Sequence, residues 1–282
     1  MLTKPEAIAA VGAGLQMAGG GWWQPGEWTD DTALALALAE SIAAHGLLDV
    51  EDVARRYIAW ATHDGKGIGR ATSRALIGAR NADDARTRAR AYFEATGMAA
   101  GNGALMRAAP IGLAARTDAD AAAAARYDAV LTHADPVAAA ASAALCAALL
   151  ALRADGEPLA AARDHARGHP RLEETLAAVG AHARGALERL AAGSEAGACW
   201  TTLGIALAAV ELFDSYERAV TWAVALGGDT DTNAAVTGAL LGCRHGARAI
   251  PPRWVAPLRD RDRIERAAGG LVLAAGSDTP LR

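Results

Sequence analysis

Apolar residues along this chain recur mainly at intervals of three and four positions, the spacing that places them on one face of an α-helix. No sustained alternation of apolar and polar residues is present, and no Asn-Gly or Asp-Gly turn joins two such runs, so strands are not expected. The pattern predicts an all-α fold. The blocks with the clearest helical spacing are residues 32–44, 53–62, 71–79, 137–152, 172–190, 199–213, 216–226 and 233–243.

Two segments interrupt the helical pattern. Residues 19–27 form a glycine-rich aromatic stretch, and residues 98–103 form a second glycine-rich stretch that ends where a new helical pattern starts. No shift in composition divides the 282 residues, so we expect a single domain over residues 1–282. Because much of the 52% hydrophobic content is alanine, the best helix former, we expect closely packed helices in one compact bundle.

Charge and cysteine content exclude several classes of protein. The net charge of −4 argues against a nucleic-acid scaffold, which would need a basic face. The three cysteines lie far apart and show no zinc-ligand spacing, which is typical of a protein in a reducing cytoplasm. Residues 136–152 are uncharged but alanine-rich and slightly short for a membrane span, so we interpret them as a buried helix and expect no membrane partner.

Two acidic clusters each precede a helical block. Thr29-Asp30-Asp31 comes before residues 33–44, and Asp229-Thr230-Asp231-Thr232 comes before residues 233–243. Either cluster alone is most simply a helix N-cap. Together they carry four carboxylates with no Lys or Arg beside them, and such a group would repel itself without a cation. Mg²⁺ prefers hard oxygen ligands, so the two clusters predict a magnesium site, with two ions roughly 3.5–4 Å apart.

Three further features could take part in binding or catalysis. The turn Gly101-Asn102-Gly103, followed by Arg107, is of a kind that binds phosphate at a helix start. Such turns also commonly connect two helices without binding a ligand. His133 precedes Asp135-Pro136, a pattern that predicts a helix start with Asp135 as the cap, and the histidine is most simply structural. The pair His63-Asp64, with His45 at another helix end, leaves open an HD-type metal phosphohydrolase as a minor alternative.

Five stretches of the chain resemble the ADP-ribosylglycohydrolase family, which includes dinitrogenase reductase-activating glycohydrolase and the ADP-ribosyl-acceptor hydrolases. They occur in the order in which the family has them. The matching stretches are GEWTDDTALALALAESI (26–42), GNGALMRAAPIGL (101–113), THADP (132–136), ALGGDTDTNAAVTGALLG (225–242) and IPPRW (250–254). The two Asp motifs are the most specific of the five.

The resemblance implies an all-α, single-domain fold with a metal site in a central cleft. It implies hydrolysis of the bond between ADP-ribose and a modified protein side chain or a related ADP-ribosyl small molecule. Asp30 and Asp31 would be catalytic. The implied ligands of two Mg²⁺ ions, with Mn²⁺ as an alternative, are Thr29, Asp30, Asp31, Asp229, Asp231 and Thr232. The implied substrate-binding residues are Gly101, Asn102, Gly103, Met106, Arg107 and His133.

The sequence departs from the family pattern at its N-terminal end. Family members open with a helix that holds a Gly-Asp-Ala-Leu-Gly-like stretch and a downstream Glu near the metals. Residues 1–21 here resemble the segment after that Glu, and neither Glu6 nor Glu27 matches its position. The sequence therefore predicts a domain without the family's first helix. It leaves open a catalytically impaired protein that binds ADP-ribose or a nucleotide on the same scaffold.

Overall fold

The computed structural model describes residues 4–12, 14–46, 48–97 and 100–276, and this part of the chain is all-α, as predicted. Its helices are α1 (Lys4–Gly12), α2 (Asp30–His45), α3 (Val50–His63), α4 (Arg70–Leu76), α5 (Ala82–Thr96), α6 (Ala109–Ala114), α7 (Asp118–Ala129), α8 (Pro136–Arg153), α9 (Pro158–Ala166), α10 (Pro170–Gly180), α11 (Arg184–Ala192), α12 (Cys199–Leu212), α13 (Tyr216–Ala225), α14 (Thr230–His245), α15 (Pro252–Val255) and α16 (Arg261–Ala275), with a 3₁₀ turn at Ala247–Ala249.

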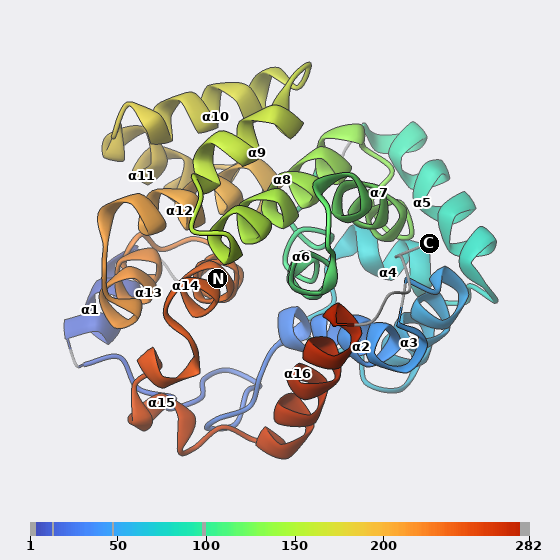
Figure 1. The fold of residues 1–282 in the computed structure, drawn as a ribbon, viewed down its shortest axis with the longest axis horizontal. Coiled ribbons are helices and arrows are strands. Elements are labelled where there is room, and N and C mark those ends of the chain that lie inside the picture. Colours follow the sequence, from blue (N-terminus) through green and yellow to red (C-terminus); the bar gives the residue numbers. More distant parts are fainter. Residues whose placement is uncertain (1–3, 13, 47, 98–99, 277–282) are drawn as a thin grey trace.

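Helix α8 lies at the centre of the molecule (Figure 1) and packs against α6, α7, α9, α12 and α14. Asp135 caps its start by accepting a hydrogen bond from Val137 N at 3.0 Å, and Pro136 occupies the first turn. By length and composition α8 could cross a membrane, yet 72% of it is buried among the other helices. Burial on most sides explains its uncharged sequence, so the prediction of a buried helix is confirmed.

Alanine dominates the contacts around α8. Seven consecutive residues, from Ala138 to Ala144, are buried, and six of them are alanine. Small side chains let neighbouring helix axes approach closely, but each buries little apolar area, so stability depends on close packing of many helices. Larger side chains such as Leu145 and Leu149 fill the remaining space in the same core.

The helical pattern misplaced one boundary. Residues 172–190 were expected to form one block, but α10 ends at Gly180 and α11 begins at Arg184. His182 between them has a φ of 52°, which reverses the chain. The apolar spacing continues through this turn, because Leu176, Val179 and Leu187 all enter the same core. Periodicity alone therefore could not locate the break.

Segments far apart in the sequence close the fold around the acidic clusters. The C-terminal helix α16 packs on α2, and α1 packs on α13 (Figure 1). Helix α14 contacts α2 as well. These contacts bring Asp30 at the start of α2 and Asp231 in the first turn of α14 to one place, although 201 positions separate them in the sequence.

Candidate metal and nucleotide site

Asp30, Asp31 and Asp231 meet at the start of α2 and α14. One carboxylate oxygen from each lies within 4.8 Å of the others. The Oδ1 atom of Asp31 is buried and has no hydrogen-bond partner. A buried carboxylate oxygen without a partner is costly, and a hard cation bound to it removes that cost. The donor set is oxygen only, so these residues fit a divalent ion such as Mg²⁺.

The two acidic clusters do not act as helix caps. Thr29 and Asp229 stand at the N-cap positions of α2 and α14, yet neither side chain accepts a hydrogen bond from its helix. Asp49, Asn81, Thr117 and Ser215 do cap their own helices in this way. Thr29 instead donates to Asp31 Oδ2 at 2.7 Å. The side chains at the starts of α2 and α14 are therefore directed toward the shared site.

Burial and mutual repulsion raise the pKa values of these acids. Burial is the main cause for Asp30, whose pKa rises to about 8, and repulsion by Asp31 and Asp231 adds to it. The pKa of Asp31 rises to about 7, again mainly through burial. The pKa of Asp229 rises to about 6 despite a hydrogen bond from Asn102. Perturbed carboxylates that share one site in a cleft commonly mark a functional centre.

Asp229 belongs to a second set of contacts next to the acid cluster. Its Oδ2 accepts a hydrogen bond from Asn102 Nδ2 at 2.7 Å, and the same amide nitrogen donates to Thr202 Oγ1 at 3.0 Å. The backbone of Asn102 donates to Gly197 O at 3.0 Å. The glycine-rich loop, defined here as residues 101–103, is thereby fixed beside the acids.

Gly228 explains the glycine pair that precedes Asp229. It has a φ of 71°, and a Cβ atom built on it would lie 2.1 Å from the backbone oxygen of Ala191. Only glycine fits this position. The backbone that Gly228 approaches is the end of α11.

The acids and the glycine-rich loop line one cleft of about 920 Å³. This volume is in the range of small-molecule sites. The predicted residues that line it are Asp30, Gly101, Asn102, Gly103, Met106, His133, Asp229, Asp231 and Thr232. The structure thus brings nearly all of the predicted site residues together. Thr29 and Asp31 are not among the lining residues, and Asp31 is only 2% exposed.

Arg107 does not line the cleft. It is completely buried, and its Nε donates to Asp128 Oδ2 at 2.8 Å. Its Nη1 donates to the backbone oxygen of Gly103 at 3.0 Å and to Thr132 Oγ1 at 2.8 Å. The sequence suggested that Arg107 contacts a ligand directly. That prediction is wrong, because the guanidinium donates its hydrogen bonds to residues inside the protein. Its role is to hold the glycine-rich loop in place.

His133 lies against the glycine-rich loop and is connected to Arg107 through Thr132. Burial and the nearby Arg107 charge lower the pKa of His133 to about 3, so the ring is neutral. Thr132 Oγ1 lies 2.8 Å from His133 Nδ1. In the tautomer in which Thr132 Oγ1 donates to Nδ1, the ring proton lies on Nε2. His133 can thus donate one hydrogen bond at the glycine-rich loop, and it is not a general acid at neutral pH.

Several residues of the cleft were not singled out from the sequence. They are Trp22, Trp23, Arg70, Thr72, Tyr92, Glu195 and Trp200. Arg70 is exposed at the start of α4 and supplies the positive charge that Arg107 does not. The rarity of tryptophan and the glycine-rich setting of residues 19–27 were the available signals for Trp22 and Trp23. Arg70, Tyr92 and Glu195 lie in ordinary polar segments that carry no such signal.

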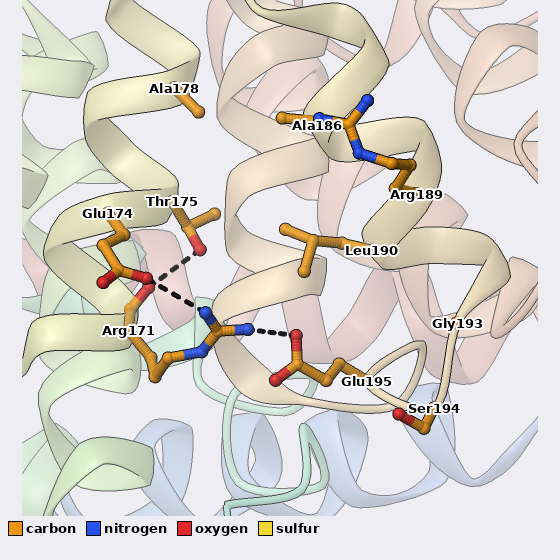
Figure 2. A pocket seen from close by; sticks show the side chains of 10 residues that line it. All are labelled: Arg171, Glu174, Thr175, Ala178, Ala186, Arg189, Leu190, Gly193, Ser194 and Glu195. Atoms are coloured by element: carbon orange, nitrogen blue, oxygen red, sulfur yellow. Dashed lines mark hydrogen bonds and ion pairs between the residues drawn. The ribbon is translucent and has the colours of Figure 1, made fainter.

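A smaller pocket of about 400 Å³ lies between α10 and α11 (Figure 2). Arg171 forms ion pairs there with Glu174 and Glu195, so its charge is neutralised within the pocket. Glu195 and Ser194 also line the larger cleft. The acid cluster lies in the larger cleft, which we therefore take as the candidate functional site.

The HD-type alternative is not supported by the placement of its histidines. His63 ends α3 and is exposed, while His45 ends α2 and lies 3.5 Å from Asp52. Neither histidine belongs to the acid cluster of Asp30, Asp31 and Asp231, and neither lines the cleft. A dinuclear site built on histidines would need them at the carboxylates.

Comparison with known proteins is consistent with this site. The family model for ADP-ribosylglycohydrolase matches residues 1–280. The chain is 31% identical to ADP-ribosyl-[dinitrogen reductase] glycohydrolase of Rhodospirillum rubrum, over 98% of this chain and 90% of the relative. It is 30% identical to the ADP-ribosylarginine hydrolase Tri1 of Serratia proteamaculans, over 92% and 71% of the two chains.

A solved structure shares the fold as well. It is titled an ADP-ribosylglycohydrolase-related protein complex, and it superposes with a TM-score of 0.70 at 33% sequence identity. The superposition covers 92% of this chain and 87% of that chain. The shared fold therefore extends over most of this chain.

Proposed function

Because the chain belongs to the ADP-ribosylglycohydrolase family, we propose that it is a Mg²⁺-dependent hydrolase that releases ADP-ribose from a modified protein side chain or a related ADP-ribosyl compound. The observation that carries this proposal is the oxygen-only acid cluster, with its unpaired Asp31 Oδ1, in one cleft with the glycine-rich loop. Two Mg²⁺ ions, or Mn²⁺ in their place, would be held by Thr29, Asp30, Asp31, Asp229, Asp231 and Thr232. We also propose that the protein is cytoplasmic.

The reaction breaks the bond between the ribose anomeric carbon and the leaving atom. Water supplies the oxygen of the new bond to that carbon, and one of its protons passes to the leaving group. The bound ions would orient the ribose hydroxyls and the attacking water. The carboxylates of this chain stabilise the positive charge that develops on the sugar. Asp30 lines the cleft together with Asp229 and Asp231, and we assign to Asp30 the proton that the water gives up.

Two parts of the cleft suit two parts of ADP-ribose, the ribose that carries the leaving group and the phosphates. The ribose whose glycosidic bond is broken would bind at Asp30 and Asp231, residues that would hold the ions. The phosphates bind along the glycine-rich loop, where His133 Nε2 donates a hydrogen bond and Arg70 supplies positive charge. Phosphate oxygens favour backbone amides and arginine as partners. Met106 contributes apolar surface on the same side of the cleft.

Turnover by this chain is tested by release of ADP-ribose from arginine-linked and serine-linked ADP-ribosyl peptides, with Mg²⁺ or with EDTA. Asp30→Asn is expected to lower kcat by roughly 10²- to 10⁴-fold, the usual contribution of a general acid or base. Asp83→Asn is the matched control, because Asp83 is 85% exposed on α5, outside the cleft. EDTA is expected to abolish release.

Release that EDTA leaves unchanged would contradict the metal-dependent mechanism. Intact binding of ADP-ribose without release from any peptide would instead assign the chain as an ADP-ribose-binding protein on this scaffold.

The two glycines of the loop offer a separate test of the phosphate end. A Cβ on Gly103 would lie 2.9 Å from His133 Cε1 and 3.2 Å from Thr72 Oγ1, whereas a Cβ on Gly101 would lie 3.4 Å from its nearest neighbour. Gly103→Ala is therefore expected to displace His133 and to weaken ADP-ribose binding roughly tenfold, in line with about 1–3 kcal/mol for overpacking. Gly101→Ala, whose Cβ would lie 3.4 Å from His133 Nε2 without displacing the ring, should weaken binding less than Gly103→Ala in the same calorimetric titration. Equal affinity of the two variants would show that His133 does not contact the ligand.

A further inference from the structure

Two adjacent tryptophans form part of the cleft lining, and they come from the glycine-rich segment of residues 19–27. Trp22 is 82% exposed and Trp23 is partly buried. A backbone hydrogen bond from Trp23 N to Gly20 O, with another in the reverse direction, fixes the turn that carries them. Neither the metal site nor the phosphate end uses these side chains.

The tryptophans stand at the Asp30 end of the cleft. A Cβ on Gly67 would lie 2.9 Å from Asp30 Oδ1 and 3.1 Å from Trp23 Cζ2, so the carboxylate and the ring border the same small space. The glycine-rich loop is attached to a different member of the acid cluster, Asp229, through Asn102. With the phosphates at the loop and the cleaved ribose at the acids, the leaving group extends toward Trp22 and Trp23.

Trp23, one of the two tryptophans, already contacts a cation. Lys66 Nζ lies 4.3 Å from the centroid of the Trp23 ring and is held by an ion pair with Glu27. The indole ring is the strongest of the aromatic side chains in attracting a cation over its face. Within the described residues no aromatic or cationic side chain covers Trp22, so its ring remains free for a ligand.

We propose that Trp22 binds the leaving group of the reaction and that this group is a planar cation, the guanidinium of a modified arginine. This inference rests on the proposed function and goes further by naming the residue that recognises the acceptor. A guanidinium stacks flat on an indole and keeps its charge while doing so. A serine acceptor has neither a flat face nor a charge, so it gains little from Trp22.

The test compares wild type with Trp22→Ala and Trp22→Phe on arginine-linked and serine-linked ADP-ribosyl peptides. We expect Trp22→Ala to raise KM for the arginine-linked peptide about three- to thirtyfold, with kcat within about twofold. Trp22→Phe retains a stacking face and should recover most of the affinity. The Kd of free ADP-ribose, which lacks the leaving group, should not change. Tyr127→Ala serves as the control, because Tyr127 is exposed outside the cleft.

Two results would overturn the assignment. An unchanged KM in Trp22→Ala shows that the ring does not meet the leaving group. An equal loss of affinity for free ADP-ribose shows that it serves the nucleotide instead. If wild type releases no ADP-ribose, the proposed function fails, and the same variants are then compared by the Kd of ADP-ribosylarginine and of free ADP-ribose, which still decides the role of Trp22.

Discussion

The metal-free protein is expected to lose stability as the pH rises from about 5 to about 8, and Mg²⁺ is expected to restore it. Burial raises the pKa values of Asp30, Asp31 and Asp229 to about 8, 7 and 6 in the folded state, well above the ordinary aspartate value. In this pH range the folded protein therefore holds protons that the unfolded chain has released. Stability from these groups is complete below the unfolded pKa and is lost as the pH passes the folded values.

Magnesium reverses the direction of this dependence. The ion binds ionised carboxylates, so its affinity rises over the same range of pH. At a concentration 100-fold above Kd it would contribute about 2.7 kcal/mol, which corresponds to a rise in melting temperature of roughly 5–10 °C for a chain of this size. Melting curves at several pH values, with and without Mg²⁺, measure both effects.

Asp31→Asn is the variant that separates the two effects. Asp31 is almost completely buried, so removing its charge should stabilise the metal-free protein at pH 8 while abolishing the response to Mg²⁺. Asp83→Asn, on the exposed face of α5, should behave as wild type. A metal-free protein whose stability is flat from pH 5 to 8, or an Asp31→Asn variant that still responds to Mg²⁺, would contradict the assignment of the site.

The helical class and most helix positions follow from local information in the sequence. Apolar spacing predicted α2, α3, α8, α12, α13 and α14, because each buries a continuous face or is buried on all sides. Helix α5 was not among the predicted blocks. It is rich in charge and buries only alanines, Ala82, Ala85 and Ala89, so its apolar stripe is too weak to recognise.

Some residues of the site could be identified from the sequence, and the position of others is shown only by the fold. The acids could be identified because two clusters of carboxylates at helix starts are unusual in composition, but only the fold shows that Asp30 and Asp231 meet. Arg107 illustrates the limit of motif reasoning. Its position beside the glycine-rich loop suggested a ligand contact, whereas its partner Asp128 lies 21 positions further along and on another helix. That pairing depends on the tertiary packing of α7, which local spacing does not encode.

Arg107→Met is expected to lower the free energy of unfolding by about 3–5 kcal/mol, the usual cost of leaving one member of a buried ion pair without its partner. Arg107 and Asp128 are both completely inaccessible, and Tyr57 donates to the second oxygen of Asp128 at 2.9 Å. The guanidinium also lies 4.6 Å from the centroid of the Tyr57 ring. Denaturant unfolding of the variant measures the loss.

The double variant Arg107→Met/Asp128→Leu distinguishes the two roles of the arginine. Removing both charges should restore most of the stability, because no buried charge is left without a partner. ADP-ribose binding should remain weak, since the hydrogen bonds from Arg107 to Gly103 and Thr132 are still missing and the glycine-rich loop and His133 lose their support. Recovery of stability without recovery of affinity is thus the expected result. If affinity returned together with stability, the arginine would serve the core alone, and the loop would keep its shape through Asn102 and Gly197.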